Sequence, residues 1–513
     1  MRIVRRFFVL IVVVGVAAMG GQARAEAPLS PLRQAVDNAV AIVQPALVQI
    51  HVVESYFREG RETKYQISGS GVVITPEGHV LTNHHVAGHA TRIKCIFFDK
   101  EEMEATLVGK DPLTDLAIIK LQPATPRVFA TVPFADSDAV RVGDQVLAMG
   151  SPRALSQSVT LGIVSNTRMI MPASMRRYGG MEMDGEDVGA LVRWLGHDAA
   201  IYPGNSGGPL INLNGEIIGI NEIGVGLGGA IPGNLAKSVG QELIAKGKME
   251  RAWIGVDVQP RLKGRVYDQG GVLVSGVLKG SPSAEAGIEA GDILLAVNGT
   301  AVDVQFAEQL PDFNQLVADL PIGGPVAVKL QRGDEALELT MTPIEREVLL
   351  KDEVELKVWG LTVRDLSLRM AKELKRKNTD GVLVTSVRPG GPAGAAKPQI
   401  KRGDVLVSVD GEAVTEIVSL RGATESLLAD ASDPVPTLTG FERKNGQFLT
   451  VVKVGLRELQ DPGLEVKKAW LSAETQVITR DIAELLGDES LKGFRVTHVY
   501  KESTAEKGGL QVG

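Results

Sequence analysis

The loop formed by residues 202–210 carries a candidate nucleophile, Ser206, between glycines and shortly after a proline. Glycine permits unusual backbone dihedrals and a close approach of a ligand to the backbone. Such a loop can direct the N–H groups of Gly204 and Ser206 toward one point, as an oxyanion hole requires. A serine hydroxyl is a weak nucleophile alone, so catalysis would need a base and an orienting acid elsewhere in the chain.

Two upstream segments offer these partners. Residues 81–87 read Leu-Thr-Asn-His-His-Val-Ala after an apolar run, and Asp115 precedes the apolar run Leu-Ala-Ile-Ile. Successive side chains on a strand point to opposite faces, so only one of His84 and His85 can face the serine. The order histidine, aspartate, serine is that of the chymotrypsin-type fold, whereas subtilisins and α/β-hydrolases use other orders. The glycine-rich segment alone would also suit an ordinary turn.

Together these motifs resemble the HtrA/Deg family of serine endopeptidases, from about residue 68 to residue 255 and into repeats behind. The resemblance assigns the catalytic triad to His85, Asp115 and Ser206 and the oxyanion hole to Gly204, Asn205 and Ser206. The family pattern Thr-Asn-x-His-Val selects His85 over His84. The implied fold is mostly β, with a chymotrypsin-like double β-barrel protease domain followed by PDZ-like α+β modules. The resemblance also implies unfolded or misfolded exported proteins as substrates and a trimer-based homo-oligomer.

The predicted substrate pocket is apolar. Ala200 stands six positions before the serine, where a trypsin-like enzyme would carry an acid, so the pocket offers no partner for Lys or Arg. The residues assigned to the pocket are Ala200, Ile201, Ile223 and Gly224. The loop of residues 221–232 is shorter than the usual family loop and has Gly229 where relatives usually carry phenylalanine before Ala-Ile-Pro. A preference for small aliphatic side chains is therefore a hypothesis.

The composition favours several β-rich domains. A chain of 513 residues suggests about three domains, and 58 glycines with 4% aromatic residues suit turn-rich modules. Up to about residue 230, short β-branched runs alternate with turn residues, which predicts a barrel or a sandwich. Residues 171–197 interrupt this pattern with methionines, arginines and paired glycines, which predicts either a mobile surface loop or simple methionine packing.

The first 25 residues predict a secretory signal. Arg2, Arg5 and Arg6 precede an apolar run over residues 7–19, and an Ala-x-Ala cleavage pattern ends at Ala25. The apolar run is short for a bilayer span, which needs about 20 residues, although an uncleaved anchor is the alternative. The protein is therefore expected to be exported, to the periplasm or cell envelope.

Charge, cysteine and histidine content bear on nucleic-acid binding, on the state of the cysteine and on metal binding. Removing the four arginines of the signal changes the formal net charge from −7 to −11, which argues against nucleic acid as a partner. Cys95, the single cysteine, is expected to be a buried apolar residue of a strand. His84 and His89 raise the question of a metal, but zinc needs three or four converging ligands and no further His or Cys cluster lies nearby in sequence. No metal and no cofactor are predicted.

Behind the protease part the chain repeats itself, and the repeats resemble PDZ modules. The predicted domains are the signal peptide 1–25, the protease domain 26–250, PDZ-like domains at 251–348 and 354–458, and an incomplete third repeat at 462–513. PDZ modules bind chain termini by adding a strand to a sheet edge. The expected carboxylate-binding residues are Ile254, Gly255, Val256, Gly360, Leu361 and Thr362. The alternative is that the PDZ folds act only as spacers.

The predicted function is an ATP-independent serine endopeptidase that acts on unfolded polypeptides through an acyl-enzyme. Two rivals from other classes stay open. One is a chaperone or adaptor that holds clients through its PDZ modules with little cleavage, and the other is a structural scaffold. The complete Ser-His-Asp set argues against both, because neither would need it.

Overall fold

The computed structural model describes residues 30–151, 158–171, 182–224, 226–261, 270–444, 446–455, 471–501 and 503–513. The predicted signal peptide, residues 172–181 of the predicted loop, and Trp470 lie outside the described residues. The chain divides into two compact units, Met1–Val454 and Gly455–Gly513. Among the described helices, none combines the length and the apolar character needed to cross a bilayer.

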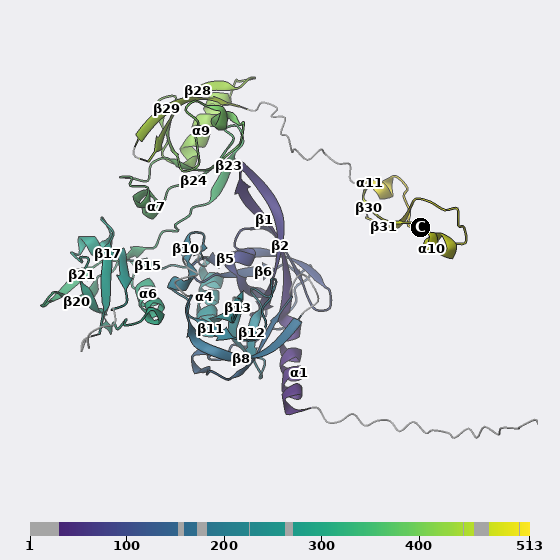
Figure 1. Cartoon of the computed structure of the whole chain (residues 1–513), viewed down its shortest axis with the longest axis horizontal. Helices are drawn as coiled ribbons and strands as arrows, with labels where there is room; N and C mark the ends of the chain where they lie inside the picture. Colours follow the sequence, from purple (N-terminus) through teal and green to yellow (C-terminus); the bar gives the residue numbers. More distant parts are fainter. Residues whose placement is uncertain are drawn as a thin grey trace, which may run out of the picture. The chain divides into compact units, whose positions relative to one another are not determined.

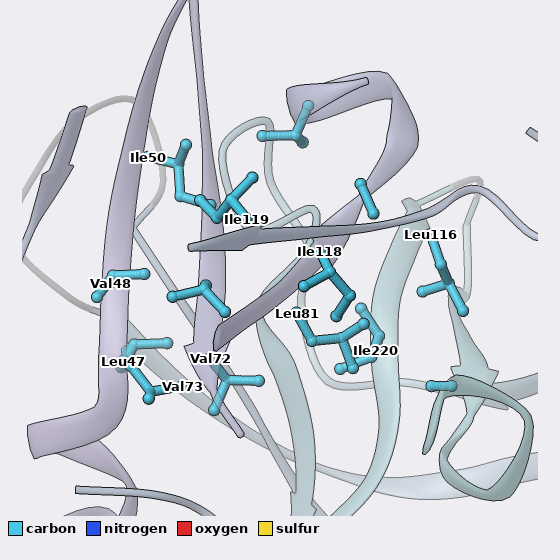
Figure 2. Packing of buried hydrophobic residues seen from close by; sticks show 14 of the residues in the cluster. Leu47, Val48, Ile50, Val72, Val73, Leu81, Leu116, Ile118, Ile119 and Ile220 are labelled. Carbon is cyan, nitrogen blue, oxygen red and sulfur yellow. The ribbon is translucent and has the colours of Figure 1, made fainter. Parts of the chain in front are cut away.

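The first barrel of the protease part is closed by six strands in the order β1-β2-β3-β6-β5-β4. Its strands are β1 (Leu47–Arg58), β2 (Arg61–Val73), β3 (His79–Asn83), β4 (Ala90–Ile96), β5 (Glu102–Asp111) and β6 (Leu116–Leu121). One-turn helix α2 (His84–Ala87) follows β3. Alternating apolar residues of these strands point inward, and Figure 2 shows Ile50, Val72 and Leu81 among them. Cys95 is fully buried on β4, which confirms the prediction of a buried apolar residue.

The second barrel closes in the order β11-β14-β13-β12-β7-β8. Its strands are β7 (Gln145–Gly150), β8 (Ser158–Met169), β11 (Trp194–His197), β12 (Pro209–Asn212), β13 (Ile217–Gly224) and β14 (Gly228–Pro232). Ile220 of β13 joins the same hydrophobic cluster as the first barrel, as Figure 2 shows. The double barrel expected from the family resemblance is thus confirmed.

Two helices flank the barrels. Helix α1 (Pro31–Val43) begins at Ser30, whose side chain accepts a hydrogen bond from the Arg33 N–H, and Pro31 suits the first helical turn. Helix α4 (Gly233–Lys246) ends at Gly247, which adopts the left-handed conformation with φ +75° that favours glycine after a helix. Figure 1 follows these elements along the chain.

Part of the stretch at residues 171–197 is ordered as a hairpin, β9 (Glu182–Met183) paired with β10 (Glu186–Asp187), followed by a 3₁₀ turn at Val188–Ala190. Met171 is buried in the protease core and Met183 packs against it. For these two methionines the packing interpretation is confirmed.

Two further sheets follow the protease part. The first contains β16 (Val256–Gln259), β17 (Val272–Val277), β18 (Ile293–Val297), β19 (Thr300–Ala301), β20 (Val326–Arg332) and β21 (Glu335–Met341), with helices α5 (Pro282–Glu285) and α6 (Leu310–Ala318). A separate pair joins β15 (Ala252–Trp253) to β22 (Ile344–Glu345). The second sheet contains β23 (Glu353–Leu356), β24 (Leu361–Asp365), β25 (Val382–Val387), β26 (Val405–Val409), β27 (Glu412–Ala413), β28 (Val435–Arg443) and β29 (Gly446–Val454), with helices α7 (Leu368–Glu373), α8 (Pro392–Ala395) and α9 (Ile417–Leu428).

The two sheets differ at the edge that matters for peptide binding. In the first sheet, β16 is the terminal strand, so one side of it has no sheet partner among the described residues. In the second sheet, the matching strand β24 lies between β25 and β23. β23 pairs antiparallel with β24, with Leu356 opposite Leu361 at one end of the pairing and Glu353 opposite Arg364 at the other. A peptide could therefore add directly to β16, whereas on β24 that position is taken by the chain itself.

The second unit is small. Its elements are β30 (Ala473–Val477), α10 (Arg480–Leu485), β31 (Phe494–Val499) and α11 (Thr504–Lys507). β30 and β31 pair antiparallel and leave Phe494 and Leu485 largely exposed. An isolated strand pair of this kind is marginally stable in water.

Candidate active site

His85 and Asp115 meet through two hydrogen bonds. His85 Nδ1 donates to Asp115 Oδ2 over 2.6 Å, and the His85 backbone N–H donates to Asp115 Oδ1 over 2.8 Å. The Asp115 side chain is fully buried, whereas that of His85 is 30% exposed. A proton held on Nδ1 leaves Nε2 as the acceptor on the accessible side of the ring. The pair can thus act as an oriented general base.

The backbone around Asp115 explains why it stays in this position. Asp115 has φ +51°, in the left-handed region that aspartate tolerates better than most residues. Its carbonyl oxygen accepts from the His84 N–H and from Asn83 Nδ2, both over 2.9 Å. The turn between β5 and β6 is therefore tied to the start of α2, the helix that carries His85.

The loop with Ser206 is fixed by Ser70 of β2. The Ser70 N–H donates to the Ser206 carbonyl over 2.8 Å, and the Ser70 hydroxyl donates to the Gly204 carbonyl over 2.6 Å. Gly204 and Gly207 have φ +105° and +82°. A Cβ at Gly207 would lie 2.2 Å from the Ser70 carbonyl oxygen, so this position tolerates only glycine.

The Ser206 hydroxyl donates to the carbonyl oxygen of Glu222 over 3.3 Å. Within the described residues, no hydrogen bond joins it to His85. Catalytic hydrogen bonds are often long or absent without substrate. Engaging His85 would exchange the bond to Glu222 for one to His85 Nε2.

The backbone N–H groups of the predicted oxyanion hole differ in whether they already donate a hydrogen bond. The Asn205 N–H donates to the Tyr202 carbonyl over 2.9 Å and is therefore occupied. In the part of the chain that the structure describes, the N–H groups of Gly204 and Ser206 have no acceptor. Of the three predicted residues, these two retain free donors.

Glu222 is a buried acid that sequence reasoning missed. Its side chain accepts a hydrogen bond from Trp194 Nε1, and Glu222 is 4% exposed. Burial, together with the neighbouring charge of Asp115, raises the pKa of Glu222 well above its usual value. Both effects favour the neutral, protonated form of the Glu222 carboxyl group. An acid within the apolar strand β13 was the signal that could have revealed it.

The predicted pocket residues separate into two groups. Ala200 is exposed, and a Cβ on Gly224 would lie 3.3 Å from Ile201 Cβ, so Ile201 and Gly224 lie together. Ile223 instead packs into the core, where a Cβ at Gly229 would meet its Cγ1 at 2.5 Å. Val225, in the loop that shapes the predicted pocket, lies outside the described residues.

The first set of predicted carboxylate-binding residues lines a cavity of about 140 Å³. Ile254 is buried, Gly255 has φ +76°, and Val256 begins the edge strand β16. Phe313, Asn314 and Val317 of α6 form the facing wall. Protease residues close one end, because Leu113 and Leu191 pack on Ala318 and Asn314 Nδ2 donates to the Ala190 carbonyl over 2.8 Å.

In the second set of predicted carboxylate-binding residues, polar groups already form hydrogen bonds within the protein. The Gly360 N–H donates to the Leu356 carbonyl over 3.0 Å, and Leu361 is fully buried. The Thr362 hydroxyl shares a 2.6 Å hydrogen bond with the Ser386 hydroxyl, which also accepts from the Gly60 N–H of the β1–β2 turn over 2.8 Å. The loop around Gly360 is therefore less suited to bind a free carboxylate group than the loop around Gly255.

Comparisons with known proteins agree with this geometry. The trypsin-like peptidase domain family matches residues 69–220, and PDZ domain families match residues 273–332 and 347–425. The chain is 33% identical over 381 residues to the periplasmic serine endoprotease DegP of Salmonella typhimurium, spanning 72% of this chain and 74% of that protein. It is 36% identical over 372 residues to a probable periplasmic serine endoprotease DegP-like of Brucella suis, spanning 67% and 66%.

Among solved structures, the HtrA-type protease AlgW with a decapeptide superposes with a TM-score of 0.51 at 28% identity, covering 61% of this chain and 99% of that one. The double barrel, the two PDZ domains and the extent of the DegP similarity point the same way. The chain belongs to the HtrA/DegP family of periplasmic serine endoproteases.

Proposed function

We propose that His85, Asp115 and Ser206 form the catalytic triad of this endoprotease. The observation that carries the assignment is the two-point contact between His85 and Asp115, at 2.6 and 2.8 Å. It fixes the imidazole so that Nε2 remains available as the base. Ser206 lies on the glycine loop, where its own N–H and that of Gly204 have no acceptor among the described residues.

The proposed reaction forms an acyl-enzyme. Ser206 Oγ attacks the scissile carbonyl carbon while His85 Nε2 takes the hydroxyl proton and then delivers it to the leaving amine. Asp115 holds the imidazole tautomer and stabilises its charged form. The N–H groups of Gly204 and Ser206 bind the oxyanion, and losing one such donor typically costs about 10²–10³ in rate. Water then repeats the steps in reverse order to release the acid product.

For substrates we propose unfolded or misfolded exported polypeptides, held by their C-termini at the first PDZ domain. The free edge of β16 and the adjoining cavity support this role. A related protease, AlgW, has been solved with a decapeptide. We further propose a homo-oligomeric assembly built from trimers, and domains spanning 26–250, 251–348, 354–458 and 462–513.

A chaperone or adaptor with little proteolysis is the second candidate. It is favoured by one observation, the hydrogen bond from the Ser206 hydroxyl to the Glu222 carbonyl instead of to His85. In that state the nucleophile is not activated. Binding of a substrate or of a peptide would have to shift the hydroxyl before cleavage could begin.

One experiment separates the two functions. The full chain and its Ser206→Ala variant are incubated with an unfolded model protein, and fragments and soluble client are measured together. A fluorophosphonate probe is tested on the same proteins, with exposed Ser432→Ala as the matched control. Fragments and labelling that disappear only in Ser206→Ala support the protease. Soluble, uncleaved client and no labelling of the full chain would favour the chaperone.

A further inference from the structure

Two histidines beside the catalytic-base candidate meet a carboxylate from a distant part of the chain. His84 Nε2 lies 3.0 Å from Asp184 Oδ2, and His89 Nε2 lies 2.7 Å from Asp184 Oδ1. One ligand atom from each of the three residues can be chosen so that all lie within 4.8 Å of one another. No third ligand could be recognised near the two histidines in the sequence, because Asp184 follows them by about a hundred positions.

The Asp184 carboxylate is presented by a tight turn. Asp184 and Gly185 form the two-residue connection of the β9–β10 hairpin, with φ +52° and +76°. These dihedrals suit the type I′ turn that the Asp-Gly sequence favours. On the other side, His84 belongs to α2 and His89 follows the end of that helix. The cluster therefore joins two short, locally fixed elements.

The surroundings of the cluster suit a cation. His84 is 2% exposed, and the Asp184 side chain is 21% exposed. Glu54 of β1 stands opposite Ala90, the neighbour of His89. Burial raises the pKa of Glu54, and the charges of His89 and His84 oppose this effect, which places Glu54 within electrostatic reach of the cluster. A second acidic side chain thus lies near the three side chains of the cluster.

We propose that His84, His89 and Asp184 bind a divalent transition-metal ion of the zinc type, with water as the fourth ligand. Two imidazole nitrogens and one carboxylate oxygen are a ligand set that zinc accepts, with bonds of about 2.0–2.2 Å. Tetrahedral ligand atoms at that distance are about 3.4 Å apart. The observed imidazole–carboxylate separations of 2.7 and 3.0 Å would have to widen slightly, and the ligand atoms of the whole set already lie within 4.8 Å of one another.

The second coordination sphere limits the affinity. His84 Nδ1 is buried and has no hydrogen-bond partner among the described residues. Metal-ligating histidines usually donate their other N–H to a partner, and losing such a partner costs about 10- to 100-fold in affinity. We therefore expect moderate affinity and not that of a structural zinc site.

A metal ion at this position would link helix α2, which carries the base candidate, to the β9–β10 hairpin and its partners outside the barrels. α2 carries His85 next to His84, and the hairpin carries Glu186 two residues after Asp184. Glu186 pairs with Arg346 over 2.7 Å and with Arg369 over 3.2 Å. A bound ion would hold the hairpin against α2 and so join the segment with the base candidate to residues outside the barrels.

The test measures metal binding directly. The full chain with Ser206→Ala, which prevents self-cleavage and leaves the cluster intact, is titrated with zinc by calorimetry and with cobalt by visible absorption. Variants His89→Gln and Asp184→Asn are made in this background. Controls are His498→Gln, an exposed histidine of the second unit, and Glu182→Gln, an exposed acid of the same hairpin.

The expected result is one ion per chain, visible cobalt bands typical of tetrahedral coordination, and at least a tenfold loss of affinity in both cluster variants but in neither control. The His89 side chain is 38% exposed, so His89→Gln should fold normally, and a thermal melt checks this. Absence of stoichiometric binding, or equal affinity in the cluster variants and the controls, would overturn the proposal. In that case the cluster is only an ion pair between the hairpin and α2.

Discussion

Glu222 brings a second buried carboxyl group next to Asp115, the residue that orients His85. Two neighbouring carboxylates in a low-dielectric environment cannot both ionise easily, so one of them retains its proton. Asp115 accepts two hydrogen bonds from His85, whereas Glu222 accepts one from Trp194 and has an oxygen without a partner. The pKa of Glu222 is accordingly the one that is raised, and its neutral form is the favoured one.

This relationship predicts a pH-dependent effect of Glu222→Gln. The folded-state pKa of Glu222 lies above the unfolded value of 4.5, so its contribution to stability is present below that value and lost as pH rises through the folded pKa. Glutamine stays neutral, so the melting temperature of the variant relative to the parent should rise between pH 5 and pH 8. The measurement is thermal melting in the Ser206→Ala background. A difference that does not vary with pH would contradict the assignment.

Glu222→Ala is predicted to be more harmful than Glu222→Gln. It leaves the buried Trp194 N–H without an acceptor, which costs about 1–3 kcal/mol. It also removes the group beside Asp115. We expect kcat/KM to stay within about threefold of the parent for glutamine and to fall about tenfold or more for alanine. Peptide cleavage assays on both variants measure this, and equal losses would show that only the side-chain volume matters.

The buried imidazole of His197 is expected to make the folded protein less stable in acid. Burial lowers the pKa of His197 to about 4, from an ordinary value of 6.5. Its contribution to stability is present above pH 6.5 and is lost as pH falls toward 4, by on the order of 3 kcal/mol in total. His197→Phe should make the melting temperature less sensitive between pH 7.5 and pH 5. The exposed His498→Phe is the matched control, and an equal acid shift in parent and His197→Phe would contradict the prediction.

The sequence predicted the double barrel, which is confirmed, and it indicated the candidate triad, because each rests on local patterns. The residues around His85, Asp115 and Ser206 are short motifs, and the strands show β-branched runs between turn residues. Asp184 could not be found in this way, and for Glu222 the local pattern shows an acid within an apolar strand but not its contact with Asp115. Their roles arise when β13 meets the turn carrying Asp115, and when a hairpin about a hundred residues downstream meets α2. Such contacts depend on tertiary packing, which local propensity does not specify.

A buried ion pair links the turn before Asp115 to Arg251, the residue directly before β15. Arg251 Nη2 lies 2.5 Å from Asp111 Oδ2, with the side chains 6% and 3% exposed, and the Thr114 hydroxyl also donates to Asp111. Asp111→Asn should destabilise the protease by about 3–5 kcal/mol, because the Arg251 charge stays buried without its partner. The apolar pair Asp111→Leu with Arg251→Met should recover part of this loss. Thermal melting of the single and double variants measures both effects, and a double variant less stable than Asp111→Asn would contradict the argument.

The two PDZ domains are predicted to bind peptides unequally. Gly255 has φ +76°, and a Cβ there would lie 2.2 Å from the Ser281 Cβ, so Gly255→Ala should distort the loop beside the free edge of β16. Gly360 has φ +66° and a milder contact, 3.1 Å to Pro392 Cδ, and its neighbouring strand β24 is already paired with β23. A labelled decapeptide with a free C-terminal carboxylate should therefore lose at least about tenfold in affinity with Gly255→Ala, a loss typical of a strained backbone position. It should bind Gly360→Ala as it binds the parent. An amidated peptide is the control for carboxylate recognition. Loss of peptide affinity with Gly360→Ala but not with Gly255→Ala would contradict the prediction and would show that β23 separates from β24 to admit the peptide.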